Sequence, residues 1–396
     1  MQEYMEKQAC ITGIGQTRFV RRPDVYPFKL GVEACEKAVA DAGLTFDDID
    51  GLASSPLGVH GVGEGMTAAS PADIANTFGL RLNWHGSGEN GAQYSSVLNA
   101  IAAIAAGYCK HVLVFRAWGE RWVPTYGKGF QDKGKLLARS SSWKSWLEPF
   151  WAPSAANWLG VHASVHMHRY GTTREQMSAI PIQLRKNAAR NPQALYREPL
   201  SFEDYMNGRM ISTPLGLYDC DIPCDGAVAM VISRRDLAKD MRCAPVRFEA
   251  VGGGARTGID ERVARPDFPH MMMHDAAAMM WSRTTWKPKD VDTAHLYDGF
   301  TYLTLFWLEA LGFCEEGASG AFVEGGHRIA PDGELPLNSN GGQLSEGRSH
   351  GWGHLHEAVL QLRGDAGERQ IKDAKVAVAS AGGGSLGGCL LLTNQE

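Results

Sequence analysis

The sequence predicts an α/β fold in which one structural unit occurs twice. Short apolar runs alternate with helical patterns along the chain, an order typical of βαβ units around buried parallel strands. Two similar segments, "DDIDGL" (47–52) and "KDVDTAHL" (289–296), each lead into a strand at the same place in their half. Each half then continues with a helix, a glycine and an apolar strand, so the second half repeats the order of the first.

The first half opens with "ACITGIGQTRF" (9–19), an apolar run with glycines that predicts a strand. A helical pattern over residues 28–43 follows, and Gly43 is expected to end it. Residues 93–117 then combine an amphipathic helix, a glycine stop and an apolar strand. These elements define the first copy of the unit.

The second half begins with a β-rich run at residues 244–258, and a helical pattern follows at 271–284. Residues 353–380 again give a helix, a stop at Gly364 and a strand. In such folds ligands bind where strands end and helices begin. Side chains directly after the strands are therefore expected to face a shared cleft.

A segment rich in tryptophan separates these patterns and is too long for a simple connection. We predict that residues 118–215 form a loop or cap domain inserted in the first half. The N-terminal half then comprises residues 1–117 and 216–244, and the C-terminal half residues 245–396. The aromatic side chains of the cap fit two alternatives, a pocket for a bulky apolar substrate or an aromatic helical core.

The composition is that of a globular protein, with 396 residues, 44% hydrophobic and 21% charged. The net charge of −5 gives no reason to expect nucleic-acid binding. No signal peptide and no membrane span are expected, and eight scattered cysteines predict reduced thiols and a cytoplasmic location. Cys220 and Cys224 in "CDIPC" have no second Cys/His pair at zinc-site distance, and the flanking aspartates are typical of turns, so no metal site is expected.

The chain resembles the thiolase superfamily over nearly its whole length. The resemblance rests on "ITGIGQTRF", "AVADAGLTFDDIDGL", "YDCDIPCDGAVAMVIS", "LPLNSNGGQLSEG" and "SAGGGSLGG". Within the superfamily, the chain is similar to the lipid-transfer-protein branch of sterol-carrier thiolases. "YDGFT", "GGQLSEG" and "HEAVLQLRG" resemble the steroid side-chain-cleaving acyl-CoA aldolases of that branch. The resemblance implies a duplicated, five-layered α-β-α-β-α core with an inserted loop domain, and acyl-CoA substrates.

The resemblance also shows which thiolase groups are replaced. The position of the nucleophilic cysteine falls near Asn90, and the asparagine or histidine before "DGF" becomes Tyr297. The "GHP" histidine falls on Arg348, where the related aldolases usually have a tyrosine, and the second cysteine falls on Ser380. Without a cysteine nucleophile there is no acyl-enzyme, so thiolysis by the family route is not expected.

A retro-aldol cleavage of a β-hydroxyacyl-CoA needs no acyl-enzyme and fits the groups that remain. It needs a base, a site for the enolate oxygen and an acid. We therefore predict an aldolase, a carbon–carbon lyase that releases a ketone or aldehyde and a shorter acyl-CoA from a bulky, steroid-like substrate. Two alternatives stay open: a thiolase-type acyltransferase with another nucleophile, and a non-catalytic subunit of a complex.

Tyr297 is the predicted proton-transfer group, because it lies just after the "VDTAHL" strand. A free phenol has a pKa near ~10, and Arg348 is a cation that would lower it or bind the enolate. His350 is a candidate acid or base two residues further along. Asp298 is expected to orient its neighbours or to take part directly.

Other residues of this region receive supporting roles. Asn90, Gly342, Ser380 and Gly383 are predicted to bind substrate, the glycines by bringing backbone N–H groups close to the thioester oxygen. Glu346 is either a cleft carboxylate or a helix N-terminal charge. The histidines 354 and 356 are expected to face solvent or to pack.

The resemblance further implies the assembly. No covalently bound cofactor is expected, and coenzyme A enters only as part of the substrate. The core is expected to form a homodimer. A small partner with a zinc ribbon and an OB-fold, of the DUF35 type, is expected to join it in a heterotetramer.

Overall fold

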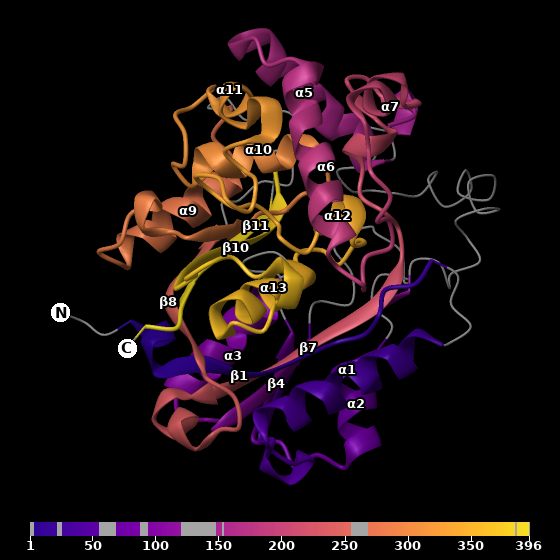
Figure 1. Ribbon diagram of the computed structural model, residues 1–396. Coiled ribbons are helices and arrows are strands. Elements are labelled where there is room, and N and C mark those ends of the chain that lie inside the picture. The colour runs from indigo at the N-terminus through magenta and orange to yellow at the C-terminus, as the bar shows by residue number, and fades with distance from the viewer. Residues whose placement is uncertain are drawn as a thin grey trace.

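The computed structural model describes eight stretches of the chain. Within them, nine strands form one mixed sheet in the order β3-β2-β4-β7-β1-β8-β11-β10-β9 (Figure 1). The described residues are 4–21, 26–54, 69–87, 94–119, 148–152, 154–254, 268–384 and 386–395. The strands are β1 (Ala9–Gln16), β2 (Gly51–Ser54), β3 (Trp84–Ser87), β4 (His111–Gly119), β7 (Asp225–Arg234), β8 (Val246–Gly254), β9 (Thr293–His295), β10 (Val376–Gly383) and β11 (Leu386–Thr393).

The strand order is symmetric about the junction of β1 and β8. The sequence β2-β4-β7-β1 of the first half is mirrored by β9-β10-β11-β8 of the second. β1 and β8 pair through only Cys10 with Arg247 and Ile11 with Val246, so two half-sheets meet along a short edge. The predicted duplication is confirmed, and "DDIDGL" and "KDVDTAHL" lead into the equivalent strands β2 and β9.

The directions of the strands differ in part from the prediction of parallel strands. Among the described strands, β2 pairs in parallel with β3 and β4, and β9 pairs in parallel with β10. The remaining neighbours are antiparallel. β11 follows β10 after a tight turn at Gly384, whose φ is +76°, and so short a connection can join only antiparallel strands.

The helices complete five layers, visible from bottom to top in Figure 1. α1 packs on β1, β4 and β7, and α9 packs on β8 and β11, each on the outer face of its half. α3 covers the inner face of the first half-sheet, and α13 contacts β9 and β10 as well as β1 and β7, so it lies between the two half-sheets. The bounds are α1 (Pro27–Ala42), α2 (Pro71–Phe78), α3 (Ser95–Ala105), α9 (Met272–Ser282), α10 (Thr301–Ala310), α11 (Ser319–Val323), α12 (Gly342–Ser345) and α13 (Trp352–Arg363).

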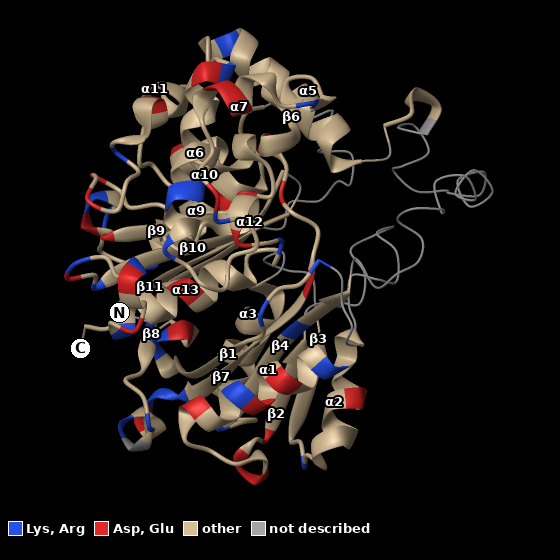
Figure 2. Cartoon of the chain, turned by 45° about the vertical axis from the view of Figure 1, so that its right-hand side comes forward, with Lys and Arg blue, Asp and Glu red and all other residues tan. Residues whose placement is uncertain are grey.

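Alternate residues of the central strands feed two separate cores, as period-two side-chain geometry requires. On β4, Leu113 and Phe115 pack with α1, whereas Val112 and Val114 belong to the larger core that contains α3 and α13. The predicted stops are confirmed, since α1 ends at Gly43 and α13 ends at Gly364, both in the left-handed conformation. Charged side chains lie mainly on the outer helices and loops, and the strands carry few (Figure 2).

The described part of the predicted cap is mostly helical. It contains α5 (Ala155–Tyr170), α6 (Arg174–Ala189), α7 (Phe202–Asn207) and the short strands β5 (Met210–Ser212) and β6 (Leu215–Gly216). α6 packs on α10, α11 and α12, which places the cap segment over the second half of the molecule. Trp122, Trp143 and Trp146 lie outside the described residues, and the predicted domain boundaries stay predictions.

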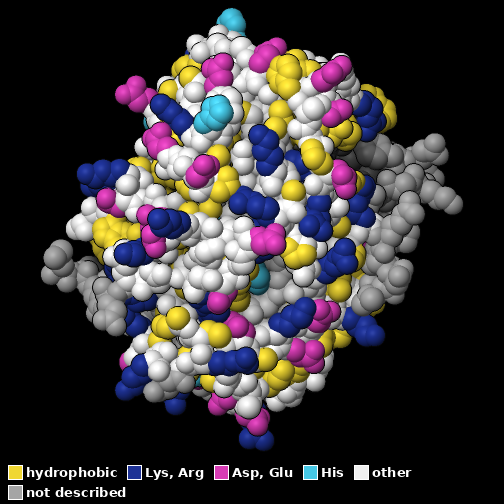
Figure 3. Space-filling model, viewed as in Figure 1, with side chains coloured by type: hydrophobic (Ala, Val, Ile, Leu, Met, Phe, Trp, Pro, Cys, Tyr) yellow, Lys and Arg dark blue, Asp and Glu magenta, His cyan; other side chains and the backbone are white. Residues whose placement is uncertain are grey.

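The surface carries no single charge sign on the face shown in Figure 3, where basic and acidic side chains are interspersed. Among the described residues, no helix combines the length and apolarity that a membrane crossing requires.

Candidate active site

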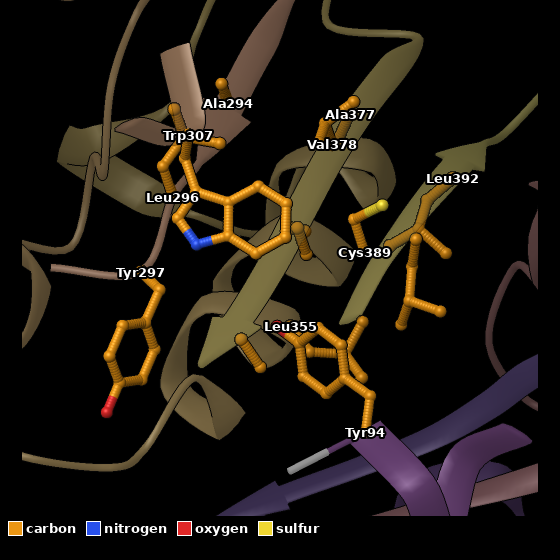
Figure 4. Close-up of a cluster of buried hydrophobic side chains, with 14 of the residues drawn as sticks. Tyr94, Ala294, Leu296, Tyr297, Trp307, Leu355, Ala377, Val378, Cys389 and Leu392 are labelled. Atoms are coloured by element: carbon orange, nitrogen blue, oxygen red, sulfur yellow. The ribbon is translucent and has the colours of Figure 1, made fainter. Parts of the chain in front are cut away.

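Tyr297 lies two residues beyond the end of β9. Its backbone N–H donates a hydrogen bond of 2.9 Å to Oγ of Ser380 on the neighbouring strand β10, which fixes the backbone at this point. The ring packs beside the apolar cluster that contains Leu296 and Trp307, and its hydroxyl points away from that cluster (Figure 4). Among the described residues, the hydroxyl has no hydrogen-bond partner.

The phenol of Tyr297 stays protonated at neutral pH. Burial raises its pKa above the ordinary value of 10.0, and the negative charge of Asp221 raises it further. Arg348 and Arg116 lower the pKa, as the sequence suggested for Arg348, but burial dominates. Asp298 adds a smaller upward contribution. Tyr297 is therefore a proton donor in its resting state, and it becomes a base only after it has given its proton away.

Gly299 has no side chain, and this leaves room for the Tyr297 ring. A Cβ at this glycine would lie 2.6 Å from Cε1 of Tyr297 and 3.0 Å from its Cζ and Oη. Carbon atoms in contact prefer about 3.5–4.0 Å, so any side chain here would displace the ring. The glycine of "YDGF" thus determines where the phenol lies.

Asp298, the next residue, is fully buried. Its carboxylate accepts hydrogen bonds from the backbone N–H groups of Gln343 (2.9 Å) and Leu344 (3.2 Å), at the beginning of α12. It also lies 2.9 Å from Nε2 of His354 on α13. Asp298 and His354 therefore join α12 and α13, and the direct part of Asp298 in the reaction stays a prediction.

Arg348 forms an ion pair with Asp221, with Nη2 and Oδ1 2.5 Å apart. The Arg348 side chain is 20% exposed and that of Asp221 4%. The aspartate belongs to "CDIPC", which the sequence suggested only as a turn. The guanidinium is thus held by a protein carboxylate beside Tyr297.

His350 lies on the same loop in a left-handed conformation, with a φ of +55°. Its backbone N–H donates 2.6 Å to Oε1 of Gln343, which also accepts from the N–H of Ser349. The imidazole lies edge-on to Trp118, with ring centroids 6.5 Å apart, so residues from both halves meet here. Gln343 therefore shapes the loop that carries Arg348 and His350.

The residues predicted to bind substrate have different surroundings. The N–H of Gly342 donates to Oδ1 of Asn340 (3.1 Å), and a Cβ at Gly342 would lie 2.1 Å from Oδ2 of Asp298. This glycine is needed for the approach of Asp298. Gly383 packs against Leu303, Asn90 lies outside the described residues, and the substrate-binding role of these positions stays a prediction.

Glu346 is buried behind the loop and faces a polar pocket rather than Tyr297. Asn340 donates to its Oε2 (2.5 Å), and Gln16 and Asn191 donate to its Oε1. Burial, followed by the nearby charge of Glu357, nevertheless raises the pKa of Glu346 to about 8. It is a buried carboxyl that is largely protonated at neutral pH, and it is not a solvated charge at a helix terminus.

Tyr94 joins the two halves beneath the site. Its hydroxyl donates to the backbone carbonyl of Gly351 (2.8 Å) and lies 3.2 Å from that of Ser380. Gly351 belongs to the loop between α12 and α13 (residues 346–351, the candidate catalytic loop), and Ser380 belongs to β10. Sequence reasoning missed Tyr94, Gln343 and Asp221. Their partners are more than 100 residues away, so no local pattern predicts these contacts. The sequence showed only that Tyr94 and Asp221 lie next to recognised motifs.

Cys220 and Cys389, two cysteines near the site, are not activated thiols. Cys389 pairs with Ser380 across β10 and β11, and burial raises its pKa. Burial likewise raises the pKa of Cys220 to about 12. Within the described residues, no three His, Cys, Asp or Glu side chains are grouped so that they could hold a metal ion.

Comparison with known proteins places this geometry in a family. Residues 255–389 match the family described as thiolase C-terminal domain-like. The chain is 35% identical over 367 residues to 17-hydroxy-3-oxo-4-pregnene-20-carboxyl-CoA lyase of Mycobacterium tuberculosis, covering 90% of this chain and 92% of that protein. It is 32% identical to the steroid side-chain-cleaving aldolase of Thermomonospora curvata, with 95% of each chain covered.

Solved structures agree. The Ltp2-ChsH2(DUF35) aldolase superposes with a TM-score of 0.87 and 31% identity over 98% of both chains. An acetyl-CoA acetyltransferase from Syntrophomonas wolfei has a TM-score of 0.68 at 17% identity and shares the fold. The chain therefore belongs to the thiolase superfamily, in the branch that contains the steroid side-chain-cleaving aldolases.

Proposed function

We propose that the protein is an aldolase that cleaves a bulky hydrophobic β-hydroxyacyl-CoA, of the steroid side-chain type, by a retro-aldol reaction. One observation carries the proposal: a buried, protonated phenol, Tyr297, stands where thiolases hold an asparagine or histidine. The names of the two relatives above support the reaction class and the CoA thioester.

The residues can be arranged into a balanced reaction. His350 takes the proton of the β-hydroxyl, the Cα–Cβ bond breaks, and its electron pair moves into the thioester to give an enolate. The β-carbon leaves as a ketone or aldehyde. Tyr297 donates its proton to Cα, which yields the shorter acyl-CoA, and the proton on His350 returns to the phenolate. Arg348 supplies positive charge near the enolate while it is paired with Asp221.

A thiolase-type acyl transfer is supported less well by the same site. That route needs a thiolate, because the thiol itself is a weak nucleophile. Ser380 stands in place of the second cysteine, and the pKa values of neighbouring Cys220 and Cys389 are raised rather than lowered. Neither Cys220 nor Cys389 therefore fits the thiolate that the acyltransferase alternative needs.

The proposal includes an assembly. We propose a homodimer that binds a DUF35-type partner in a heterotetramer, with support from the partner named in the solved aldolase. CoA is part of the substrate, and no covalently bound cofactor takes part. None of the eight cysteines, which all lie in the described part of the chain, forms a disulfide, and we propose a cytoplasmic location.

The test offers a β-hydroxyacyl-CoA and, separately, a β-ketoacyl-CoA with free CoA to the chain, with and without a DUF35-type partner. The expected result is release of a carbonyl compound from the β-hydroxyacyl-CoA in the absence of free CoA. Turnover of only the β-ketoacyl-CoA, and only with free CoA, would support the acyltransferase instead. Absence of turnover of both substrates with the partner present would support a non-catalytic subunit.

A further inference from the structure

The segment Cys220–Cys224 of the first half passes between the two pieces of the second half that form the candidate site. On one side it pairs with the Tyr297 segment. The N–H of Asp221 donates to the carbonyl of Gly299 (3.1 Å), and Cys220 forms an isolated antiparallel bridge with Phe300. The absence of a side chain at Gly299 leaves room for the Tyr297 ring, so this segment holds the backbone next to the phenol.

On its other side, the same segment pairs with the catalytic loop. The N–H of Ile222 donates to the carbonyl of Gln343 (3.2 Å), and the N–H of Arg348 donates to the carbonyl of Ile222 (2.9 Å). The thiol of Cys224 also donates to the carbonyl of Arg348 (3.3 Å). The relative position of Tyr297 and Arg348 is therefore set by backbone bonds that both converge on residues 220–224.

Only one charged side chain of this segment points into the arrangement. Asp221 is 4% exposed in its side chain and forms the 2.5 Å ion pair with Arg348. A buried ion pair is maintained only when both partners are well paired, and loss of one partner is strongly destabilising. Asp221 thus joins two parts of the site: its backbone N–H bonds to the Tyr297 segment, and its side chain bonds to Arg348.

We propose that Asp221 is a positioning residue that holds the Arg348 guanidinium near the Tyr297 segment. The inference rests on the proposed role of Tyr297 as a proton donor. The carboxylate opposes ionisation of the phenol and the guanidinium favours it, while Arg116 and Asp298 also act on Tyr297 and are unchanged by substitutions in the pair.

This role makes a prediction of sign. Asp221→Asn removes the negative charge but keeps the N–H that bonds to Gly299 and an amide oxygen that can accept from Arg348. The guanidinium therefore stays in place, and the pKa of Tyr297 falls. Arg348→Gln removes the positive charge, so the pKa of Tyr297 rises. The double variant removes both charges, and the pKa lies between those of the single variants. Asp221→Ala removes the acceptor of Arg348 as well as the charge. If Asp221 holds the guanidinium in place, the pKa of Tyr297 is higher in Asp221→Ala than in Asp221→Asn, and equal values in the two variants would contradict the positioning role.

The measurement is a titration of the full chain labelled with fluorinated tyrosine and followed by fluorine NMR. The fluorinated phenol is more acidic, which brings ionisation into the range where the protein is folded. A labelled Tyr297→Phe variant identifies the resonance, and Asp236→Asn, at an exposed ion pair with Arg234, controls for charge removal alone. Shifts of both single variants in one direction, or of neither, would overturn the proposal.

Two further arms keep the test decisive. If Asp221→Asn does not fold, Arg348→Gln and the double variant decide, because the proposal requires a higher pKa in the first than in the second. Aldolase assays of the same samples separate the two claims. If the pKa of Tyr297 shifts in opposite directions but the wild type does not cleave β-hydroxyacyl-CoA, the proposed function is wrong and the role of Asp221 is supported. If the wild type cleaves the substrate but the pKa of Tyr297 is the same in all variants, the proposed function is supported and the role of Asp221 is wrong.

Discussion

Replacement of Gly299 by alanine tests whether the position of the Tyr297 ring governs activity. The added Cβ would lie 2.6 Å from Cε1 of Tyr297, about 1 Å closer than ordinary carbon contacts allow. The backbone of Gly299 is held by Asp221, so the ring is the part that moves. A displacement of about 1 Å at a reacting group lowers activity roughly 100-fold, and overpacking costs about 1–3 kcal/mol of stability.

The assay compares kcat/KM for the β-hydroxyacyl-CoA in wild type, Gly299→Ala, Tyr297→Phe and the double variant. Circular dichroism and urea unfolding verify that each variant is folded. We expect a large loss in Gly299→Ala, and no further loss when it is added to Tyr297→Phe, because the hydroxyl to be misplaced is then absent. The reasoning is refuted if Gly299→Ala keeps the wild-type kcat/KM.

Three further predictions concern stability. The pKa of Glu346 is raised from 4.5 to about 8, so the stability that this group contributes is present below pH 4.5 and is lost as pH rises towards 8, by about 4–5 kcal/mol at 1.36 kcal/mol per pKa unit. Urea unfolding from pH 5 to 9 is expected to show this slope in the wild type and a flatter one in Glu346→Gln; equal slopes would contradict it. Tyr94→Phe leaves carbonyls of the catalytic loop and β10 without their donor and should lower the free energy of unfolding by about 1–3 kcal/mol, and an unchanged urea midpoint would count against it. Asp298→Asn places an amide donor against a backbone N–H at the beginning of α12 and should cost about 1–3 kcal/mol, with wild-type thermal stability as the opposing result.

Local patterns were sufficient to predict the duplicated core. Gly43 and Gly364 end helices by adopting left-handed conformations that other residues avoid, so the stops are visible in the sequence. The antiparallel strands were not predicted, because strand direction depends on the path of the connection between two strands. The hydrophobic pattern of a strand contains no information about that path.

The candidate site was predictable only in part. Tyr297, Arg348 and His350 follow recognisable motifs, and the structure places them in neighbouring segments. Asp221 was interpreted as a turn residue. Its partner Arg348 lies 127 positions away, so no local sequence pattern predicts the ion pair. The pKa of Tyr297 could not be predicted either, since it depends on burial that arises only when both halves pack.

The central claim is that Tyr297 donates the proton that completes a retro-aldol cleavage. The most direct measurement incubates the chain and its DUF35-type partner with a β-hydroxyacyl-CoA in D2O without free CoA, and analyses the products by mass spectrometry. The account predicts equal amounts of carbonyl product and shorter acyl-CoA, with one solvent deuterium at Cα, and loss of both products in Tyr297→Phe. Cleavage that requires free CoA and a β-ketoacyl-CoA, or full activity of Tyr297→Phe, would contradict it.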